Sequence, residues 1–398
     1  MRTDRATSSK SDLAGTQEAA RLMLEFAERT GLTSRAPQRR YLWTDAFAVC
    51  NFLALERRLK DTHYGVLALD LIDRVHHTLG QHRSDDPRKG WLSGLSGAEA
   101  EAHPTAGGLR IGKPLPERLP AQAADPQLEW EQDGQYFHYL TKWMHALDQA
   151  ASHTRRSELH RWACELAETA HRGFVDRSSR SGGLRMFWKM SIDLSRPLVT
   201  SMGQHDPLDG WITCVQLCTS ATDLAGHDSA LTDAVVDFAR MKASHGLSTT
   251  DPLGLGGLLT DAYRAQQLLQ RGASLAPGLI NELLVAVARG LGAYAWQGGL
   301  RSPPSRRLAF RELGLAIGIS ALELLARGVQ AMPDVPGEEG LPATVEALVS
   351  YSALGAQIRS FWRQVEHRSS PSWAAHRDIN DVMLATSLIP DGFLVFGR

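Results

Sequence analysis

Acidic, imidazole and aromatic side chains recur in this sequence wherever a strongly apolar segment begins. Six such stretches follow one another along the chain: LWTDAF, DGQYFHYLTKW, QHDPLDGW, TTDPLGLGG, SRRLAFREL and HRDINDV. Carboxyl and imidazole groups can transfer protons to and from a bound substrate. Aromatic rings can pack against the apolar C–H faces of a sugar while polar groups bind its hydroxyls. The six stretches therefore predict a site that binds and converts a small hydroxylated molecule.

The first two stretches supply carboxyl groups for acid–base chemistry. Thr44 can cap a helix that starts there, which leaves Asp45 free to point elsewhere. Trp43 and Phe47 flank Asp45, and apolar surroundings favour the protonated form that a general acid needs. Asp133 is the second candidate, although an aspartate before a glycine can equally cap a helix. We predict Asp45 and Asp133 as catalytic residues and Trp43 as a substrate contact.

The second stretch also contains a histidine in a polar row. Gln135, His138 and Lys142 have the i, i+3, i+7 spacing of one helix face, and Tyr136 lies beside them. A buried histidine is often only a core residue, but a row of polar groups on an otherwise packed helix favours function. His138 is therefore a candidate base, and Gln135, Tyr136 and Lys142 are candidate substrate contacts.

The third stretch adds a histidine and two aspartates at the start of another apolar segment. His205 and Asp206 are candidates for acid–base catalysis, and Asp209 is a candidate substrate contact. Asp206 precedes Pro207, and an aspartate in that position is also a common helix cap. A carboxylate in the first helical turn, as at Asp209, also favours the helix dipole. Structural roles for both aspartates stay open.

The connections between apolar segments carry further candidates. Alternating residues predict a small β-like arm near 184–195. The long connection 83–133 contains Gly107 and Gly108 beside a basic residue, which suits an anion, and it is placed to form a lid or rim. Basic side chains near the site favour an anionic substrate, unless they pair with neighbouring acids. The predicted contacts in this group are Arg110, Trp188, Lys189, Arg311 and His376.

Helical periodicity dominates the elements that must position these residues. Amphipathic segments alternate with segments that are apolar on all sides, and the long connections follow the amphipathic ones. This order predicts an all-α fold, an (α/α)6 toroid of six helical hairpins with the long connections on one face. The twelve predicted helices span roughly 14–30, 44–59, 63–82, 134–151, 155–174, 207–225, 229–243, 253–271, 277–294, 306–327, 341–366 and 376–388.

This alternation, with aromatic and acidic residues where each inner helix begins, resembles the six-hairpin glycosidase-like superfamily. DGQYFHYLTKWMHAL, from Asp133 to Leu147, looks most like the start of an inner helix in that group. The superfamily includes unsaturated glucuronyl hydrolases, N-acylglucosamine 2-epimerases and several polysaccharide lyases. The resemblance implies a carbohydrate-active enzyme with its site at the inner-helix starts.

Composition limits the remaining possibilities. The chain has 398 residues and a formal net charge of −1, with no long block of one sign and no apolar run long enough to span a membrane, so we expect neither a nucleic-acid nor a membrane partner. No motif indicates a metal or a cofactor, and nothing indicates an oligomer. Residues 1–12 are polar and lack the apolar core of a secretory signal. We expect a flexible segment over 1–12, one domain over 13–398 and a cytoplasmic location.

Three functions are compatible with these residues. The first is a glycoside hydrolase acting on a small, possibly anionic saccharide, which needs two carboxyl groups across the scissile bond. The second is a sugar epimerase or isomerase, or a polysaccharide lyase, in which histidine and tyrosine remove a proton from carbon. The third is a toroid that binds a ligand without converting it. The sequence favours the hydrolase and leaves the others open.

Overall fold

The computed structural model describes residues 2–177, 183–223, 231–244, 246–296, 298–331 and 337–397. The chain forms two compact units. Unit 1 comprises the chain up to Arg29, then Asn51–Tyr64 and Leu247–Phe396, and unit 2 comprises Thr30–Cys50, Gly65–Gly246 and the last two residues. The single domain predicted over 13–398 stays a prediction. Positions 224, 225, 229 and 230 of two predicted helices lie outside the described residues.

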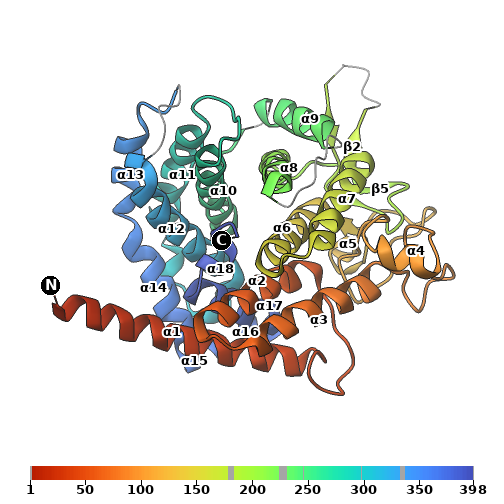
Figure 1. Cartoon of the computed structure of the whole chain (residues 1–398), viewed down its shortest axis with the longest axis horizontal. Helices are drawn as coiled ribbons and strands as arrows, with labels where there is room; N and C mark the ends of the chain where they lie inside the picture. Colours follow the sequence, from red (N-terminus) through yellow and green to blue (C-terminus); the bar gives the residue numbers. More distant parts are fainter. Residues whose placement is uncertain are drawn as a thin grey trace. The chain divides into compact units, whose positions relative to one another are not determined.

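All twelve predicted helical segments are present, and the eleventh is divided into two helices (Figure 1). They are α1 (Arg2–Arg29), α2 (Leu42–Leu59), α3 (Thr62–Leu79), α6 (Phe137–Thr154), α7 (Ser157–Phe174), α8 (Asp206–Asp223), α9 (Thr232–Ala243), α10 (Pro252–Gln270), α11 (Leu279–Trp296), α12 (Ala309–Gly328), α13 (Leu341–Val349) with α14 (Ser352–Arg363), and α17 (Arg377–Leu388). Half-exposed helices alternate with buried ones over six successive pairs, which confirms the all-α class and the helix order of an (α/α)6 fold. Helix α1 includes residues 2–12, for which the sequence predicted a flexible segment.

Shorter elements lie in the connections. They are α4 (Gly97–Ala102), α5 (Pro126–Glu131), α15 (Val365–Arg368), α16 (Pro371–Ala375), α18 (Asp391–Leu394) and the 3-10 turns η1 (Gly299–Arg301), η2 (Pro304–Arg306) and η3 (Val329–Ala331). Among the described residues, no helix is long and apolar enough to cross a membrane.

The predicted β-like arm is confirmed in unit 2. Strand β1 (Gln135–Tyr136) pairs antiparallel with β4 (Lys189–Met190), which pairs in turn with β5 (Pro197–Val199). A second antiparallel pair joins β2 (Val175–Asp176) to β3 (Arg185–Met186). Because β1 leads directly into α6, the pairing with β4 fixes the arm beside the first turn of that helix.

A buried hydrogen-bond network joins α6, α7 and α8 inside unit 2. The Asp148 carboxylate contacts the His160 imidazole at 2.9 Å and accepts hydrogen bonds from Gln216 at 2.7 Å and Ser220 at 3.0 Å. All four side chains are buried. Satisfied polar groups of this kind fix the register between helices, since an unpaired buried carboxylate would be costly. The network therefore positions the second half of α6 relative to the second half of α8.

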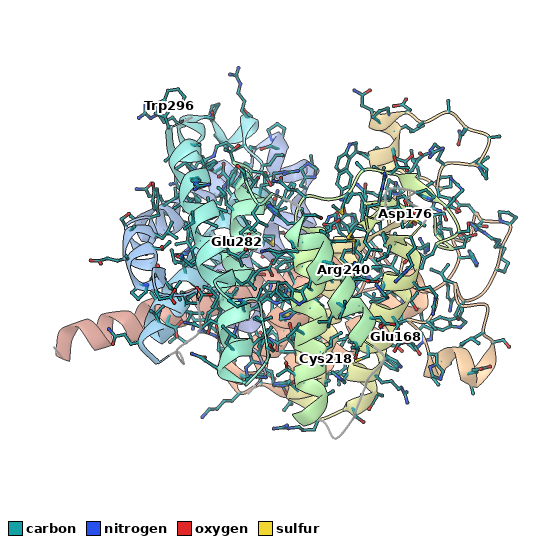
Figure 2. The ribbon with its side chains drawn as sticks, turned by 90° about the horizontal axis from the view of Figure 1, so that it is seen from above. Glu168, Asp176, Cys218, Arg240, Glu282 and Trp296 are labelled. Atoms are coloured by element: carbon teal, nitrogen blue, oxygen red, sulfur yellow. The ribbon has the colours of Figure 1, made fainter. Side chains whose placement is uncertain are left out.

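In unit 1, glycines let two apolar helices approach closely. A Cβ atom at Gly256 of α10 would lie 2.2 Å from the Gly314 carbonyl oxygen of α12. On α14, Trp362 is fully buried and donates a hydrogen bond to Glu312 at 2.8 Å. By contrast, Trp296 ends α11 with 89% of its surface exposed (Figure 2).

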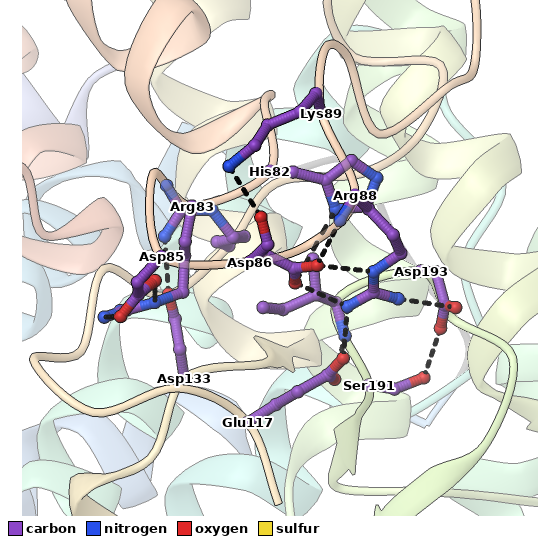
Figure 3. Close-up of polar contacts among 12 residues, drawn as sticks. His82, Arg83, Asp85, Asp86, Arg88, Lys89, Glu117, Asp133, Ser191 and Asp193 are labelled. Atoms are coloured by element: carbon purple, nitrogen blue, oxygen red, sulfur yellow. Dashed lines mark hydrogen bonds and ion pairs between the residues drawn. The ribbon is translucent and has the colours of Figure 1, made fainter. Parts of the chain in front are cut away.

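Ion pairs attach the long connection 83–133 to the β arm. Arg88 donates hydrogen bonds to Asp86, Glu117 and Asp193 at 2.7, 2.6 and 2.9 Å (Figure 3). Glu117 also accepts a hydrogen bond from the Ile192 N–H at 2.7 Å. The connection predicted as a lid or rim is thus anchored within unit 2.

Candidate active site

A cluster of rings surrounds the first turn of α6 in unit 2. The His138 ring lies 4.7 Å from that of Tyr139, 5.4 Å from Tyr136 and 6.3 Å from Trp188, with the last pair stacked. Trp188 stands between β3 and β4, and it also contacts Trp130 of α5 edge-on at 5.0 Å. Strand pairing therefore brings the predicted residues Tyr136, His138 and Trp188 together.

His138 faces a carboxyl group from the next inner helix. Its Nδ1 atom lies 3.9 Å from Oδ1 of Asp206, at the first residue of α8. Nδ1 of His138 and Oδ2 of Asp206 are both buried, and neither has a hydrogen-bond partner among the described residues. Unpaired buried polar atoms are uncommon in folded proteins and often mark functional groups. Asp206 does not act as the helix cap that Pro207 suggested, since no backbone N–H donates to its side chain.

The surroundings move the pKa values of these two groups in opposite directions. Burial, with a contribution from the Lys142 charge, lowers the pKa of His138 to about 4. Burial, with a contribution from the Asp209 charge, raises the pKa of Asp206 to about 7. At neutral pH the imidazole is therefore uncharged, and the Asp206 carboxyl group is near its midpoint of ionisation. Such separated values are characteristic of acid–base sites.

Asp209 and Lys142 form an ion pair beside this dyad. Lys142 Nζ lies 2.8 Å from both carboxylate oxygens of Asp209, and Thr141 donates a short hydrogen bond to the same carboxylate. The pair joins α6 to α8 and leaves little net charge at the site. Both were predicted as substrate contacts, and the structure gives them partners within the protein.

Two tyrosine hydroxyls meet on the other side of His138. The hydroxyl oxygens of Tyr41 and Tyr139 are 2.5 Å apart, and the two rings meet edge-on. Burial raises the pKa of Tyr41 to about 12, so its hydroxyl keeps its proton over the physiological range. A protonated hydroxyl pair can donate a hydrogen bond to an oxygen on which negative charge develops.

Asp45 does not have the free carboxyl group expected from the sequence. Helix α2 begins at Leu42, two residues before the predicted start, so the Asp45 carboxylate reaches back to the Tyr41 N–H at 3.0 Å. It also lies 3.6 Å from the Arg40 guanidinium and is 1% exposed. Trp43 is buried against Phe47 at a ring distance of 4.5 Å. The geometry gives Asp45 and Trp43 structural roles.

The second predicted carboxyl group, Asp133, is also bound by other groups of the protein. It is fully buried and accepts hydrogen bonds from Arg110 at 2.5 Å and from the Gly112 N–H at 3.0 Å. Because of this bond, Arg110 is not available to bind an anion beside Gly107 and Gly108. Gln135 lies in β1 rather than on the α6 face, and its amide donates to the Ile192 carbonyl at 2.7 Å. These three side chains hold the long connection to the β arm.

Two of the remaining candidates, Lys189 and Arg311, are bound to carboxylates of the protein. Lys189 is fully buried, and its Nζ donates to the Glu129 carboxylate at 2.9 Å and the Gln132 carbonyl at 2.8 Å. His205 is half-buried, directly before α8. Arg311, paired with Asp251 at 2.7 Å, and the exposed His376 belong to unit 1. The described residues contain no group of three or more His, Cys, Asp or Glu side chains able to hold a metal.

Three ring residues lie at the candidate site although the sequence did not predict them there. Tyr139 and Tyr41 form the hydroxyl pair, and Trp130 extends the ring cluster. Tyr139 directly follows His138 in the sequence, and this neighbouring position was the available signal. Trp130 had no local signal, because its position depends on the packing of α5 against the β arm.

No protein-family model matches this chain, and no curated protein matches it. Among solved structures, cellobiose 2-epimerase from Spirochaeta thermophila DSM 6192 is similar to it, with a TM-score of 0.48 and 13% sequence identity. The alignment covers 88% of this chain and 87% of that enzyme.

Proposed function

We propose that this protein is a carbohydrate-active enzyme, a sugar epimerase or isomerase that moves a proton at the carbon beside a carbonyl group. The observation that carries the proposal is the His138–Asp206 pair, in which both groups have an unpaired buried atom and lie among aromatic rings. The rings suit the apolar faces of a sugar, and the imidazole suits proton abstraction.

The proposed step uses His138 as the base. Its Nε2 atom makes no hydrogen bond to the described residues, and it accepts the C–H proton while Nδ1–H faces Asp206. The C–H electron pair forms the carbon–carbon double bond, and the carbonyl oxygen takes a proton from the Tyr139–Tyr41 hydroxyl pair, giving an enediol. Return of both protons completes the cycle. Return of the proton to the neighbouring carbon gives the isomer, and return to the same carbon after the enediol has turned its opposite face to His138 gives the epimer.

Asp206 is a positioning residue in this step. An ionised carboxylate beside Nδ1–H fixes the tautomer and strengthens Nε2 as a base, as in other carboxylate–histidine pairs. A separation of 3.9 Å in the free protein is compatible with this role, because catalytic hydrogen bonds often shorten only when substrate binds.

The substrate we propose is a neutral saccharide. The cations that favoured an anionic substrate in the sequence are paired: Arg110 with Asp133, Lys189 with Glu129 and Arg311 with Asp251. These three cations are therefore not available to bind a carboxylate or phosphate.

A glycoside hydrolase is the second candidate. The raised pKa of the Asp206 carboxyl, caused mainly by burial, suits a general acid. Against it, the two carboxyl groups predicted for hydrolysis, Asp45 and Asp133, hold structural contacts instead. The hydrolase would have to use Asp206 with Asp209, whose charge is balanced by Lys142.

The test is a panel of free sugars and aryl glycosides followed by NMR, with variants of the dyad. We expect interconversion of free sugars without release of an aryl group, and exchange of one C–H for deuterium in D2O. His138→Gln should lower the rate by about 10²–10⁴-fold, the usual contribution of a general base. Aryl release without sugar interconversion would select the hydrolase.

Asp45→Asn is the matched control for the dyad. It removes the charge of a buried carboxylate in the same unit that accepts the Tyr41 backbone N–H and lies beside Arg40, so it should lower the melting temperature and leave turnover per folded molecule within about twofold of wild type. A loss of turnover in folded Asp45→Asn as large as that in His138→Gln would contradict our placement of the site.

A further inference from the structure

The mechanism leaves unused a cavity of about 330 Å³ that opens beside the ring cluster. This volume lies within the range of about 300–1,000 Å³ typical of small-molecule sites. The cavity lies entirely within unit 2, between α5 and β5. Its main lining residues are Trp130, Tyr136, Trp188, Leu198, Thr200 and Ser201.

Aromatic rings make up its walls. Trp130 has 48% of its surface exposed, so part of its indole ring is accessible to a ligand. Its ring meets that of Trp188 at 5.0 Å, and Trp188 lies 5.6 Å from Tyr136 at an interplanar angle of 34°. Rings at these angles offer both faces and edges to a ligand.

Uncharged polar groups line the cavity together with two carboxylates, Asp125 and Glu129. Asp125 Oδ1 accepts the backbone N–H groups of Gln127 and Leu128 at 3.0 and 3.2 Å. Among the described residues, the indole N–H groups of Trp130 and Trp188 and the hydroxyls of Thr200 and Ser201 form no hydrogen bond. The lining carboxylate of Glu129 is already bound by Arg118 at 2.9 Å and by Lys189 at 2.9 Å. The cavity therefore offers neutral donors and acceptors beside apolar ring faces, which is the chemistry that recognises sugar hydroxyls and C–H faces together.

Buried contacts hold the cavity in shape. Lys189 Nζ, on β4, donates to the carbonyl oxygens of Glu129 and Gln132 at 2.7 and 2.8 Å. Arg118 bonds Glu129 and also donates to the Leu198 carbonyl at 3.3 Å. A wall preformed in this way loses little entropy when a ligand binds.

The cavity and the proposed base share two wall residues. Tyr136 and Trp188 line the cavity and also contact the His138 ring, at 5.4 and 6.3 Å. A ligand that reaches His138 can therefore extend along this wall.

We propose that the cavity is a subsite for a second, neutral sugar ring, so that the substrate is a disaccharide or longer saccharide. This inference rests on the proposed function for the identity of the ring that reaches His138. Trp130 is a specificity-determining residue in this arrangement, because it contacts the second ring and not the reacting one.

The test compares disaccharide and monosaccharide binding in Trp130→Ala. Maltose, cellobiose and glucose are titrated by calorimetry into His138→Gln protein, where binding is not accompanied by turnover, with and without Trp130→Ala. We expect the affinity for at least one disaccharide to fall about tenfold, as loss of an aromatic contact of about 1.4 kcal/mol implies, and its preference over glucose to shrink accordingly. Trp296→Ala, at the exposed tryptophan of α11, is the control and should change no affinity.

Three outcomes separate the inference from the proposed function. If Trp130→Ala weakens disaccharide binding but the wild type converts no sugar, the subsite is supported and the proposed function is wrong. Sugar conversion with equal disaccharide affinities in wild type and Trp130→Ala overturns the subsite and leaves the function. Trp130-dependent binding of aryl glucosides but of no disaccharide also overturns the inference, because the cavity would then accept an apolar group rather than a sugar.

Discussion

At the scale of single residues, the aspartate side chain has different roles at three of the predicted helix starts. Asp45 and Asp133 are surrounded by N–H groups and a guanidinium, which satisfy their charges. Asp206 is equally buried but accepts no hydrogen bond, and its nearest charged neighbour is another carboxylate, Asp209, with Lys142 behind it. Burial and the Asp209 charge raise the pKa of Asp206 to about 7, so this carboxyl group can change its protonation near neutral pH.

The pH dependence of the reaction follows from this difference. Asp206 carries a proton below its pKa of about 7, which burial raises, and a negative charge above it. Because the charged form is the one that accepts Nδ1–H of His138, we expect kcat/KM for sugar interconversion to rise as pH increases through about 7. Asp206→Asn should abolish this rise of kcat/KM with pH and lower the maximal kcat/KM at least about tenfold. The measurement is kcat/KM between pH 5 and 9 for both proteins.

A decrease of kcat/KM with rising pH would also decide the role of Asp206. If kcat/KM falls as pH rises through about 7, the protonated Asp206 is the active form, and Asp206 donates a proton rather than orienting His138. That outcome would contradict the positioning role and favour the hydrolase alternative.

His138, Asp206, Tyr136 and Trp188, all predicted from the sequence, lie together at the candidate site, whereas Asp45 is bound to the Tyr41 N–H and lies beside Arg40. Side-chain type and helical spacing are local, so a histidine beside a tyrosine at an inner-helix start was recognisable. The role of Asp45 depended on a two-residue difference in where α2 begins, since that shift places the carboxylate within reach of the Tyr41 N–H. Helix boundaries are the least certain feature of any sequence interpretation.

At the scale of elements, the helices were predictable and the contacts of the long connection were not. The period of apolar residues is sufficient to locate α7, because one face of that helix must be buried. The connection 83–133 has no such period. Its structure depends on partners far along the chain, such as Arg88 with Asp193 and Lys189 with Glu129. For the same reason Arg110 and Lys189 were interpreted as substrate contacts when they are internal partners.

Lys189 should therefore stabilise the α5–β4 junction rather than bind substrate. Its ammonium is fully buried and bonded to one carboxylate and two carbonyls, so Lys189→Met leaves the Glu129 charge without this partner. We expect a loss of about 3–5 kcal/mol in the free energy of unfolding, measured in urea, and faster amide exchange in β4 and α5. Adding Glu129→Gln should recover part of the loss.

Lys89→Met is the matched control for that prediction. Lys89 also donates to backbone carbonyls, those of Ser84 and Asp86, but it is exposed. Its replacement should cost less than about 0.5 kcal/mol. Equal effects of the two substitutions would show that burial of Lys189 contributes nothing to stability.

At the scale of the whole molecule, the two compact units are interleaved along the sequence. The chain passes from unit 1 to unit 2 after Arg29, returns at Asn51, leaves again after Tyr64 and returns at Leu247. The boundary at Asn51 falls inside α2, and the boundary after Tyr64 falls inside α3. Domains that fold independently are usually joined by exposed linkers, whereas here continuous helices carry the chain across.

We therefore expect the protein to unfold as one cooperative body, as the predicted domain 13–398 requires. Melting either unit would break α2 near its middle and α3 in its first turn, so the loss of one unit removes helical hydrogen bonds from the other. Calorimetry should show one transition whose van't Hoff and calorimetric enthalpies agree. Trp362→Ala, which empties a fully buried position of unit 1, should cost about 3–5 kcal/mol and move that transition to lower temperature without splitting it. Two separate transitions in the variant, with the upper one at the wild-type temperature, would instead establish two independent domains.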